Sequence, residues 1–254
     1  MDRLAFISLA GITSQAEIRA QITNGLANVS TVGFKESLAS VDETLETNGL
    51  GFNTRVAPSS PSQEFISLAP GTINSTGRAM DIAMTGNTVL GVQADNGDIG
   101  FTRRGDLRVT ANGVVENAAG HLVLGETGPI NVPPGHIVSI SPDGTVFGSL
   151  PTEPDVPALN LGQLMLRDAT EMPLIRRADA LFEPFNEQFR GRDFPTGPQP
   201  AALTSGTLEG SNVNPIEAMV KMMDFSRSYE AKIKLISEIK SIDENGASMM
   251  RLPK

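Results

Sequence analysis

The sequence predicts an α+β fold in which terminal α-helices pair as a coiled coil and an all-β domain is inserted between them. Apolar residues recur at spacings of three and four near both ends of the chain, a pattern typical of amphipathic helices. The middle contains short β-branched and aliphatic runs separated by turn dipeptides, a pattern typical of antiparallel strands. The expected organisation is a helix with its following motif over residues 1–35, a linker over 36–70, a β-rich domain over 71–185, a loop over 186–210 and a C-terminal helix over 211–254.

The N-terminal helix is predicted over residues 2–31, with a narrow seam in which small and branched side chains alternate. Small residues allow another helix to approach closely, and spacings of three and four suit coiled-coil packing. Gly11 and Gly25 each cost about 1 kcal/mol relative to alanine. The helix is therefore marginal alone, and we expect it to order on a partner. The seam consists of Leu4, Ile7, Gly11, Ser14, Ile18, Ile22, Gly25 and Val29.

The β-rich domain is predicted from five short apolar runs and the turns between them. Asn96-Gly97, Asn112-Gly113 and Asp143-Gly144 are dipeptides that tight hairpin turns favour because they tolerate positive φ. Proline-containing tracts before and after this domain predict a linker and a loop. The runs expected to form strands cover residues 89–94, 107–110, 121–124, 137–140 and 161–167.

The C-terminal helix is the longest predicted element. Asn212 or Asn214 can act as its N-cap, Pro215 suits the first helical position, and Glu217 lies in the first turn. Asn245-Gly246 favours a break, so we expect the helix to end at Glu244. Its apolar residues include Ile216, Met219, Val220, Met222, Phe225, Tyr229, Ile233, Ile236 and Ile239.

Composition and motifs argue against several classes of function. The net charge of −9 and the pI near 4.8 oppose an electrostatic nucleic-acid binder. Cysteine is absent, and no apolar run reaches the roughly 18 residues that a membrane span needs. His121 and His136 have no nearby carboxylate pattern, and no phosphate loop or nucleophile motif is present. We therefore expect no enzyme activity, no metal and no cofactor.

Several separated stretches together resemble the flagellar basal-body rod and hook proteins. Residues 26–35 (LANVSTVGFK) resemble the motif LAN-x-x-T-x-GFK of that family, and residues 76–86 (TGRAMDIAMTG) resemble TG-x-x-LD-x-A-x-x-G. Residues 101–107 (FTRRGDL) are similar to YTR-x-G-x-F. Residues 206–213 (GTLEGSNV) and 227–230 (RSYE) are similar to G-x-LE-x-SNV and RAYE. The motifs follow one another in the family's order, so the resemblance covers the whole chain.

The resemblance implies a structural subunit of the flagellar rod. In that family the terminal helices form the inner wall of a helical tube and the β-domain lies outside it. The implied partners are other proximal and distal rod subunits, further copies of this chain and the flagellar export apparatus. Neither nucleic acid nor a small-molecule substrate is implied. The start of the chain lacks the pattern of a cleaved signal peptide, so export by the flagellar route to the periplasmic rod is expected.

The subtype and the interface follow from the same resemblance. Residues 208–219 most resemble the proximal rod subunit, with a distal rod or hook-type subunit as the alternative. A secreted β-domain adhesin is a weaker alternative, supported only by Arg104-Gly105-Asp106. The residues expected at the assembly interface are Leu4, Ile7, Gly11, Ser14, Ile18, Ile22, Asn28, Gly33, Phe34, Asn212, Val213, Met219, Met222, Phe225, Tyr229, Ile233 and Ile236.

Overall fold

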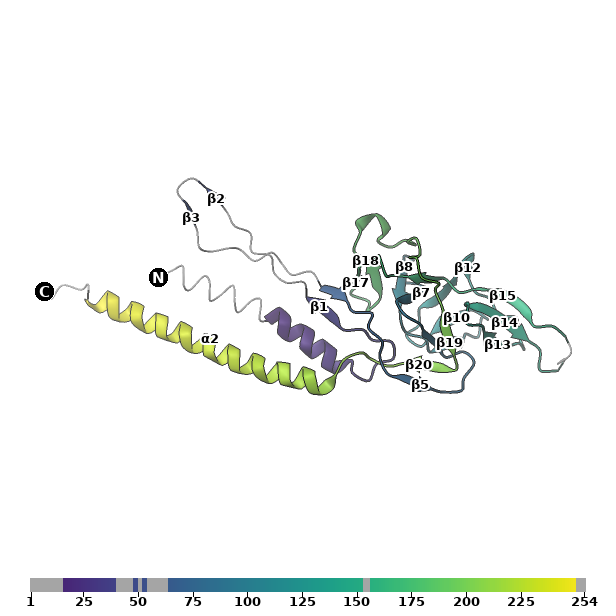
Figure 1. Cartoon of the computed structure of the whole chain (residues 1–254), viewed down its shortest axis with the longest axis horizontal. Helices are drawn as coiled ribbons and strands as arrows, with labels where there is room; N and C mark the ends of the chain where they lie inside the picture. Colours follow the sequence, from purple (N-terminus) through teal and green to yellow (C-terminus); the bar gives the residue numbers. More distant parts are fainter. Residues whose placement is uncertain (1–15, 40–47, 50–51, 54–63, 153–155, 250–254) are drawn as a thin grey trace. The chain divides into compact units, whose positions relative to one another are not determined.

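The computed structural model describes residues 16–39, 48–49, 52–53, 64–152 and 156–249 (Figure 1). The chain divides into two compact units. Unit 1 comprises Met1–Ala27, Val41–Ser62 and Asn214–Lys254, and unit 2 comprises Asn28–Ser40 and Gln63–Val213. Unit 1 contains the helices and unit 2 is built of β-sheet, so the α+β class is confirmed.

The described part of unit 1 contains two helices and a short hairpin. The first helix covers residues 16–27, the hairpin strands are β2 (Asn48–Gly49) and β3 (Phe52–Asn53), and the long helix is α2 (Pro215–Met249). Asn214 is the N-cap of α2, because its Oδ1 accepts hydrogen bonds from the backbone N–H groups of Ile216 (3.0 Å) and Glu217 (3.3 Å). The predicted start of α2 is confirmed.

Both predicted helix ends need correction. α2 continues through Asn245-Gly246 to Met249, because each residue added to an established helix gains a backbone hydrogen bond that offsets the cost of one glycine. The first helix ends at residue 27 instead of 31. Thr31 donates its backbone N–H to the Asn28 carbonyl and its hydroxyl to Asn28 Oδ1, both at 3.1 Å, which closes a turn. Residues 2–15 of the predicted helix lie outside the described residues.

Unit 2 consists of antiparallel sheets. The largest has the strand order β17-β18-β8-β7-β11-β10-β9, with β12 on β11 and β16 on β7. A three-stranded sheet has the order β13-β14-β15, and three two-stranded sheets pair β1 with β4, β19 with β6 and β20 with β5. The elements are β1 (Ser37–Ala39), β4 (Glu64–Ile66), β5 (Ile73–Ser75), β6 (Ile82–Met84), β7 (Thr88–Gln93), β8 (Ile99–Thr102), β9 (Leu107–Val109), β10 (Val115–Asn117), β11 (Leu122–Gly125), β12 (Gly128–Pro129), β13 (Ile137–Ile140), β14 (Thr145–Ser149), β15 (Leu159–Gln163), β16 (Leu166–Asp168), β17 (Leu174–Arg176), β18 (Phe182–Pro184), the 3-10 helix η1 (Glu187–Phe189), β19 (Leu203–Ser205) and β20 (Thr207–Glu209).

Two apolar clusters form the core of unit 2. The larger includes Leu90, Leu107 and Val123, all fully buried. The smaller is aromatic, and the rings of Phe101 and Phe194 meet edge to face with centroids 4.6 Å apart. Phe194 comes from the tract after η1, so this tract contributes to the core.

The predicted turns are confirmed. Gly97, Gly113 and Gly144 have φ of +88°, +79° and +84°, which glycine adopts without steric cost. Each lies in the loop of a hairpin: β7 to β8, β9 to β10, and β13 to β14.

The predicted linker, loop and fifth strand need correction. β1 and β4 pair within the expected linker over 36–70, and η1, β19 and β20 lie in the expected loop over 186–210. These strands have three residues each, too few to show an alternation pattern. The run over 161–167 forms parts of two strands, β15 and β16, which pair with β14 and β7 in different sheets.

Arg167 explains why the tract after η1 is ordered. Its guanidinium binds Asp193 with distances of 2.8 and 2.7 Å and Glu126 with distances of 2.6 and 3.0 Å. Hydrogen bonds to Glu126 and then to Asp193 raise the pKa of Arg167. The adjacent Asp168 accepts the backbone N–H of Gln199 at 3.0 Å. Two neighbouring side chains of β16 therefore hold the tract on the sheet.

Candidate assembly site

Three of the motifs that carry the family resemblance meet at one buried ionic triad in unit 2. Lys35 Nζ lies 2.7 Å from Glu209 Oε1, and Arg103 Nε and Nη2 each lie 2.8 Å from Glu209 Oε2. Each of the three residues is at most 1% exposed. Lys35, Arg103 and Glu209 come from the motifs over residues 26–35, 101–107 and 206–213. The triad therefore joins the segment after the first helix, the end of β8 and the segment before α2.

Backbone groups complete the hydrogen bonding of the triad. Lys35 Nζ also donates to the Ala69 carbonyl at 2.7 Å, and Glu209 Oε1 accepts the Gly71 N–H at 3.0 Å. Arg103 Nη1 donates to two backbone carbonyls, those of residues 86 and 88, each at 2.7 Å. A buried ion pair is tolerated only when such hydrogen bonds replace the lost water.

The triad holds two cations and one carboxylate. Burial lowers the pKa of Lys35, the hydrogen bond to Glu209 opposes this effect, and the charge of Arg103 lowers the pKa further. Burial also lowers the pKa of Arg103, against the attraction of Glu209. The pair formed by Arg103 and Glu209 balances its own charge, so Lys35 is the additional cation.

The backbone on either side of the triad is tied together as well. Gly33 donates its N–H to the Glu209 carbonyl at 2.7 Å. Asn212 Oδ1 accepts the Glu36 N–H at 2.7 Å, and Asn212 Nδ2 donates to the Ser67 carbonyl at 3.0 Å. We call residues 33–36 the N-terminal connection and residues 209–212 the C-terminal connection. The two connections lie side by side within unit 2.

Gly33 and Arg176 fit the N-terminal connection against the body of unit 2. Gly33 has a φ of +68°, and a Cβ at this position would lie 2.4 Å from the carbonyl carbon of Arg103. The guanidinium of Arg176 donates to the Lys35 carbonyl and lies 4.4 Å from the centroid of the Phe34 ring. The GFK sequence thus supplies a glycine for close approach, an aromatic ring under a cation and a buried ammonium group.

The expected interface residues that the structure describes divide into two groups. Gly33, Phe34 and Val213 are buried inside unit 2, Asn212 is half-buried there, and Asn28 is half-buried in the turn after the first helix. The contacts described above are therefore made within the chain's own fold. Leu4, Ile7, Gly11 and Ser14 lie outside the described residues. The remaining residues lie on the helices of unit 1: Ile18, Ile22, Met219, Met222, Phe225, Tyr229, Ile233 and Ile236.

α2 presents two apolar faces at its start. Ala218 is buried, and Met222, Phe225 and Ile236 are half-buried, at spacings that keep one face of a helix. A second set lies on another face at positions i, i+3, i+4 and i+7 and is exposed. It consists of Ile216 (73%), Met219 (53%), Val220 (45%) and Met223 (55%). The sequence predicted one apolar face, because spacings of three and four occur within both sets.

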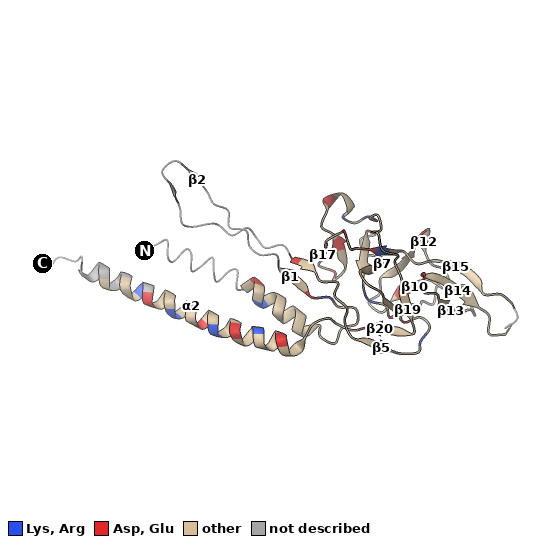
Figure 2. Ribbon diagram, viewed as in Figure 1, with Lys and Arg blue, Asp and Glu red and all other residues tan. Residues whose placement is uncertain are grey.

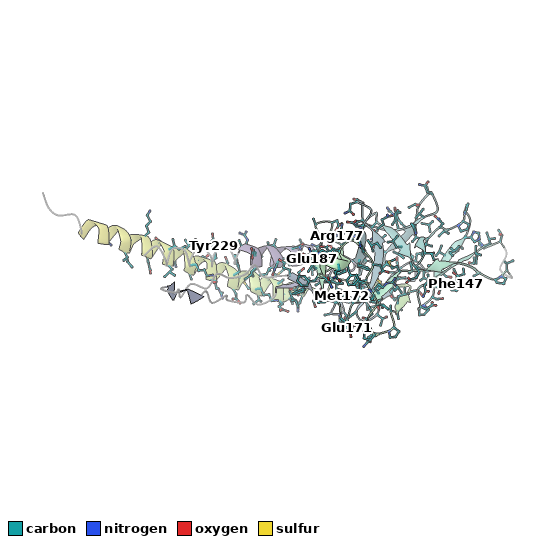
Figure 3. The ribbon with its side chains drawn as sticks, turned by 90° about the horizontal axis from the view of Figure 1, so that it is seen from above. Phe147, Glu171, Met172, Arg177, Glu187 and Tyr229 are labelled. Carbon is teal, nitrogen blue, oxygen red and sulfur yellow. The ribbon has the colours of Figure 1, made fainter. Side chains whose placement is uncertain are left out.

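A groove in unit 1 is lined by the first helix and by aromatic residues of α2. Its volume is ≈ 680 Å³. Ala16, Ala20 and Ala27 contribute small side chains from the first helix. Phe225 and Tyr229 line it from α2, with nearly parallel rings whose centroids are 6.0 Å apart (Figure 3 labels Tyr229). Small side chains of the first helix thus face aromatic side chains of α2 across the groove.

Charges on α2 are interspersed. Acidic and basic residues are mixed along the helix (Figure 2). Glu217 and Lys221 form an ion pair at 2.8 Å one turn apart, and Asp224 and Arg227 form a looser pair at 3.8 Å. Exposed pairs of this kind contribute about 0.5 kcal/mol or less each. The charged surface therefore adds little to the stability of α2 compared with its apolar faces.

The Arg104-Gly105-Asp106 tripeptide is part of the sheet body. Arg104 Nε and Nη2 bind the two carboxylate oxygens of Asp106 at 2.8 and 2.9 Å. A Cβ on Gly105 would lie 1.8 Å from the Ile82 carbonyl oxygen. The arginine and the aspartate neutralise each other, and the glycine lies against backbone. These contacts do not favour an adhesin.

The described residues offer no sign of a metal centre or a membrane helix. No group of three or more histidine, aspartate or glutamate residues in this part of the chain could hold a metal ion. Among the same residues, no helix is long and apolar enough to cross a membrane.

Comparison with known proteins identifies the family. The model of the flagellar hook protein FlgE/F/G D1 domain matches residues 83–148, and that of the flagellar basal body rod FlgEFG protein C-terminal region matches residues 204–249. The basal-body rod protein FlgF of Salmonella typhimurium is 34% identical over 248 residues, 96% of each chain. FlgF of Escherichia coli is 32% identical over 99% of this chain and 98% of its own length. FlgG of Buchnera aphidicola is 30% identical over 91% of this chain and 94% of its own length. With relatives this similar over nearly the whole length, the chain belongs to the flagellar basal-body rod protein family.

Proposed function

We propose that this chain is the FlgF-type structural subunit of the bacterial flagellar rod and that it acts in the proximal part of the rod. The main support is the 34% identity to a FlgF over 96% of both chains, which includes both the helices and the β-domain. The FlgG protein is similar to a lower degree, which favours the proximal subunit over the distal one. The function is mechanical, and we assign no catalytic step to any residue.

The terminal helices are the proposed assembly element. The groove between small residues of the first helix and the ring pair on α2 supports pairing of the two helices as a coiled coil. The exposed face formed by Ile216, Met219, Val220 and Met223 supports contacts with neighbouring subunits. A contact between two different faces that does not close into a ring produces a helical assembly, which is the symmetry of a shaft.

The proposed partners and location follow from the same assignment. The chain joins other rod subunits, both proximal and distal, and further copies of itself. It reaches the periplasm through the flagellar export apparatus. The basal-body location is supported by the relatives, which are themselves basal-body rod proteins.

Complementation in the host bacterium tests the proposal. A strain without the gene should be non-motile, and its basal bodies, viewed by electron microscopy, should lack a complete rod. The full chain should restore both. Phe225→Asp should not, because it places a charge in the groove between the helices, which costs several kcal/mol when the helices pair. Ser228→Asp is the matched control, because this exposed residue lies on neither apolar face of α2, and it should restore motility.

The outcomes separate the alternatives. Complete rods in the deletion strain would refute a rod function. A rod that is complete up to its distal segment would replace the proximal assignment with the distal one. Equal motility with both aspartate variants would refute pairing through the groove.

A further inference from the structure

We propose that Lys35 is a positioning residue that ties the N-terminal connection to the C-terminal connection, and so fixes the two points at which the chain leaves unit 2 for its terminal helices. Its effect on rod formation rests on the proposed function. Its effect within the isolated subunit does not.

The pair of Arg103 and Glu209 is neutral without Lys35. Arg103 and Glu209 form a two-pronged pair of opposite charge, and Arg103 is also bonded to two backbone carbonyls. This pair already anchors the C-terminal connection to the end of β8. Lys35 adds a second cation to a site with one carboxylate, which brings no further neutralisation. An ammonium buried at this cost is best explained by the position that it holds.

The position of Lys35 in the chain indicates what it holds. Lys35 and Glu209 are 174 positions apart, and they lie at the two places where unit 2 is connected to the helices. β20, which contains Glu209, pairs with β5, so no strand pairing joins the two connections to each other. They are joined by three backbone-linked hydrogen bonds and by the Lys35 ion pair. These bonds run from Gly33 to Glu209, from Asn212 to Phe34 and from Glu36 to Asn212.

Lys35→Met isolates this role. Methionine keeps an unbranched apolar stem of similar length and removes the ammonium group, so the packing of the site changes little while the tie is lost. The pair of Arg103 and Glu209 stays neutral. Glu209→Gln is the contrasting change, because it leaves two buried cations without a carboxylate and should destabilise unit 2 as a whole.

Pulsed electron paramagnetic resonance on the full chain measures the distance between two spin labels, and so reports whether the N-terminal connection stays fixed in unit 2. The chain has no cysteine, so a pair introduced at Ser30 and Thr204, both exposed, carries the only spin labels. In the otherwise unchanged chain this pair should give one narrow distance peak. Lys35→Met should cause loss of that peak in favour of a broad distribution. A second label pair, at Val109 and Thr204, should give a narrow distance peak both in the otherwise unchanged chain and in Lys35→Met.

Arg167→Met is the matched control variant. It also removes a cation bound to carboxylates in unit 2, but its partners, Glu126 and Asp193, belong to neither connection. It should leave the peak of the Ser30 and Thr204 pair narrow. A narrow peak retained by Lys35→Met would overturn the proposal. So would a loss of thermal stability in Lys35→Met as large as that of Glu209→Gln, because Lys35 would then be a core residue of the sheet body.

Rod formation in the host supplies the second readout. Lys35→Met should lower the yield of complete rods, and Arg167→Met should leave it unchanged. Full rod yield together with a broadened distance distribution would overturn the link to assembly. Failure of the unchanged chain to build rods would instead refute the proposed function, and the distance measurement on the monomer would still decide the role of Lys35.

Discussion

Gly33→Ala probes a close approach between the N-terminal connection and the body of unit 2. Gly33 has a φ of +68°, and the new Cβ would lie 2.4 Å from the carbonyl carbon and oxygen of Arg103 and 2.5 Å from the next backbone nitrogen. These atoms are backbone, so no side-chain rotation can make room. The N-terminal connection would have to move away from the body of unit 2.

The cost follows from three contributions. A left-handed conformation costs an alanine about 1–2 kcal/mol. Displacement weakens the hydrogen bond of 2.7 Å from Gly33 to the Glu209 carbonyl, which contributes about 1 kcal/mol. The buried triad is then strained, because Glu209 bonds through both its backbone and its carboxylate. We expect a loss of about 3 kcal/mol or more, which lowers the Tm by about 6–12 °C for a domain of this size.

Gly77→Ala is the matched control for this experiment. Gly77 has a nearly equal φ of +72°, but nothing lies within 4 Å of its potential Cβ. It should therefore show the conformational cost alone, about 1–2 kcal/mol. Urea unfolding followed by circular dichroism gives both free energies. If Gly33→Ala lowered the free energy of unfolding no more than Gly77→Ala does, the close approach of Gly33 to the Arg103 backbone would add nothing to the cost. The N-terminal connection would then pack less tightly against unit 2 than described.

Three further predictions concern the triad, its surroundings and α2. The lowered pKa of Lys35 means that the unfolded chain binds more protons just below the ordinary lysine pKa, so stability should rise as the pH rises toward about 10.5. The charged groups that face Lys35 are Arg103 and Glu209. Lys35→Met should remove this rise when the free energy of unfolding is measured against pH at fixed salt. If the free energy still rises with pH as in the unchanged chain, other groups cause the rise. Asn212→Ala removes two side-chain hydrogen bonds to backbone and should cost about 2–4 kcal/mol in urea unfolding, whereas a loss below about 1 kcal/mol would mean that water replaces them. Gly246→Ala should add up to about 1 kcal/mol to the stability of the end of α2, seen as more helical circular dichroism on heating; no gain would place Gly246 outside the helix.

The regular elements could be predicted because their signals are local. The Asn-Gly and Asp-Gly dipeptides specify positive φ within two residues, and the N-cap at Asn214 is specified within four. The predicted end of α2 at Glu244 was wrong, because the Asn245-Gly246 dipeptide was given more weight than the long helix before it. The paired strands within the expected linker and loop were missed because three residues carry too little periodicity.

The ionic triad could not be predicted, although each of its residues lies in a motif. Lys35, Arg103 and Glu209 are separated by many strands, and a charged residue in a motif is usually exposed. A signal was nevertheless present. Lys35 and Glu209 are each the only charged residue of their motifs, over residues 26–35 and 206–213, where a solvated charge would be out of place. Pairing them requires the fold, because an ion pair across 174 positions has no sequence period.

Because the two connections lie side by side, the chain enters and leaves unit 2 at adjacent points. The chain enters through residues 33–36 and leaves through residues 209–212, and the Gly33 N–H reaches the Glu209 carbonyl at 2.7 Å. Apart from Val41–Ser62, which belongs to unit 1, the chain between these two points forms one excursion that starts and ends at the paired connections. Such an excursion can gain or lose a hairpin, or be replaced by another body, without changing the spacing of the two chain ends. Proteins of this design can therefore diversify their outer surface while the helices attached to the crossing keep the same starting geometry.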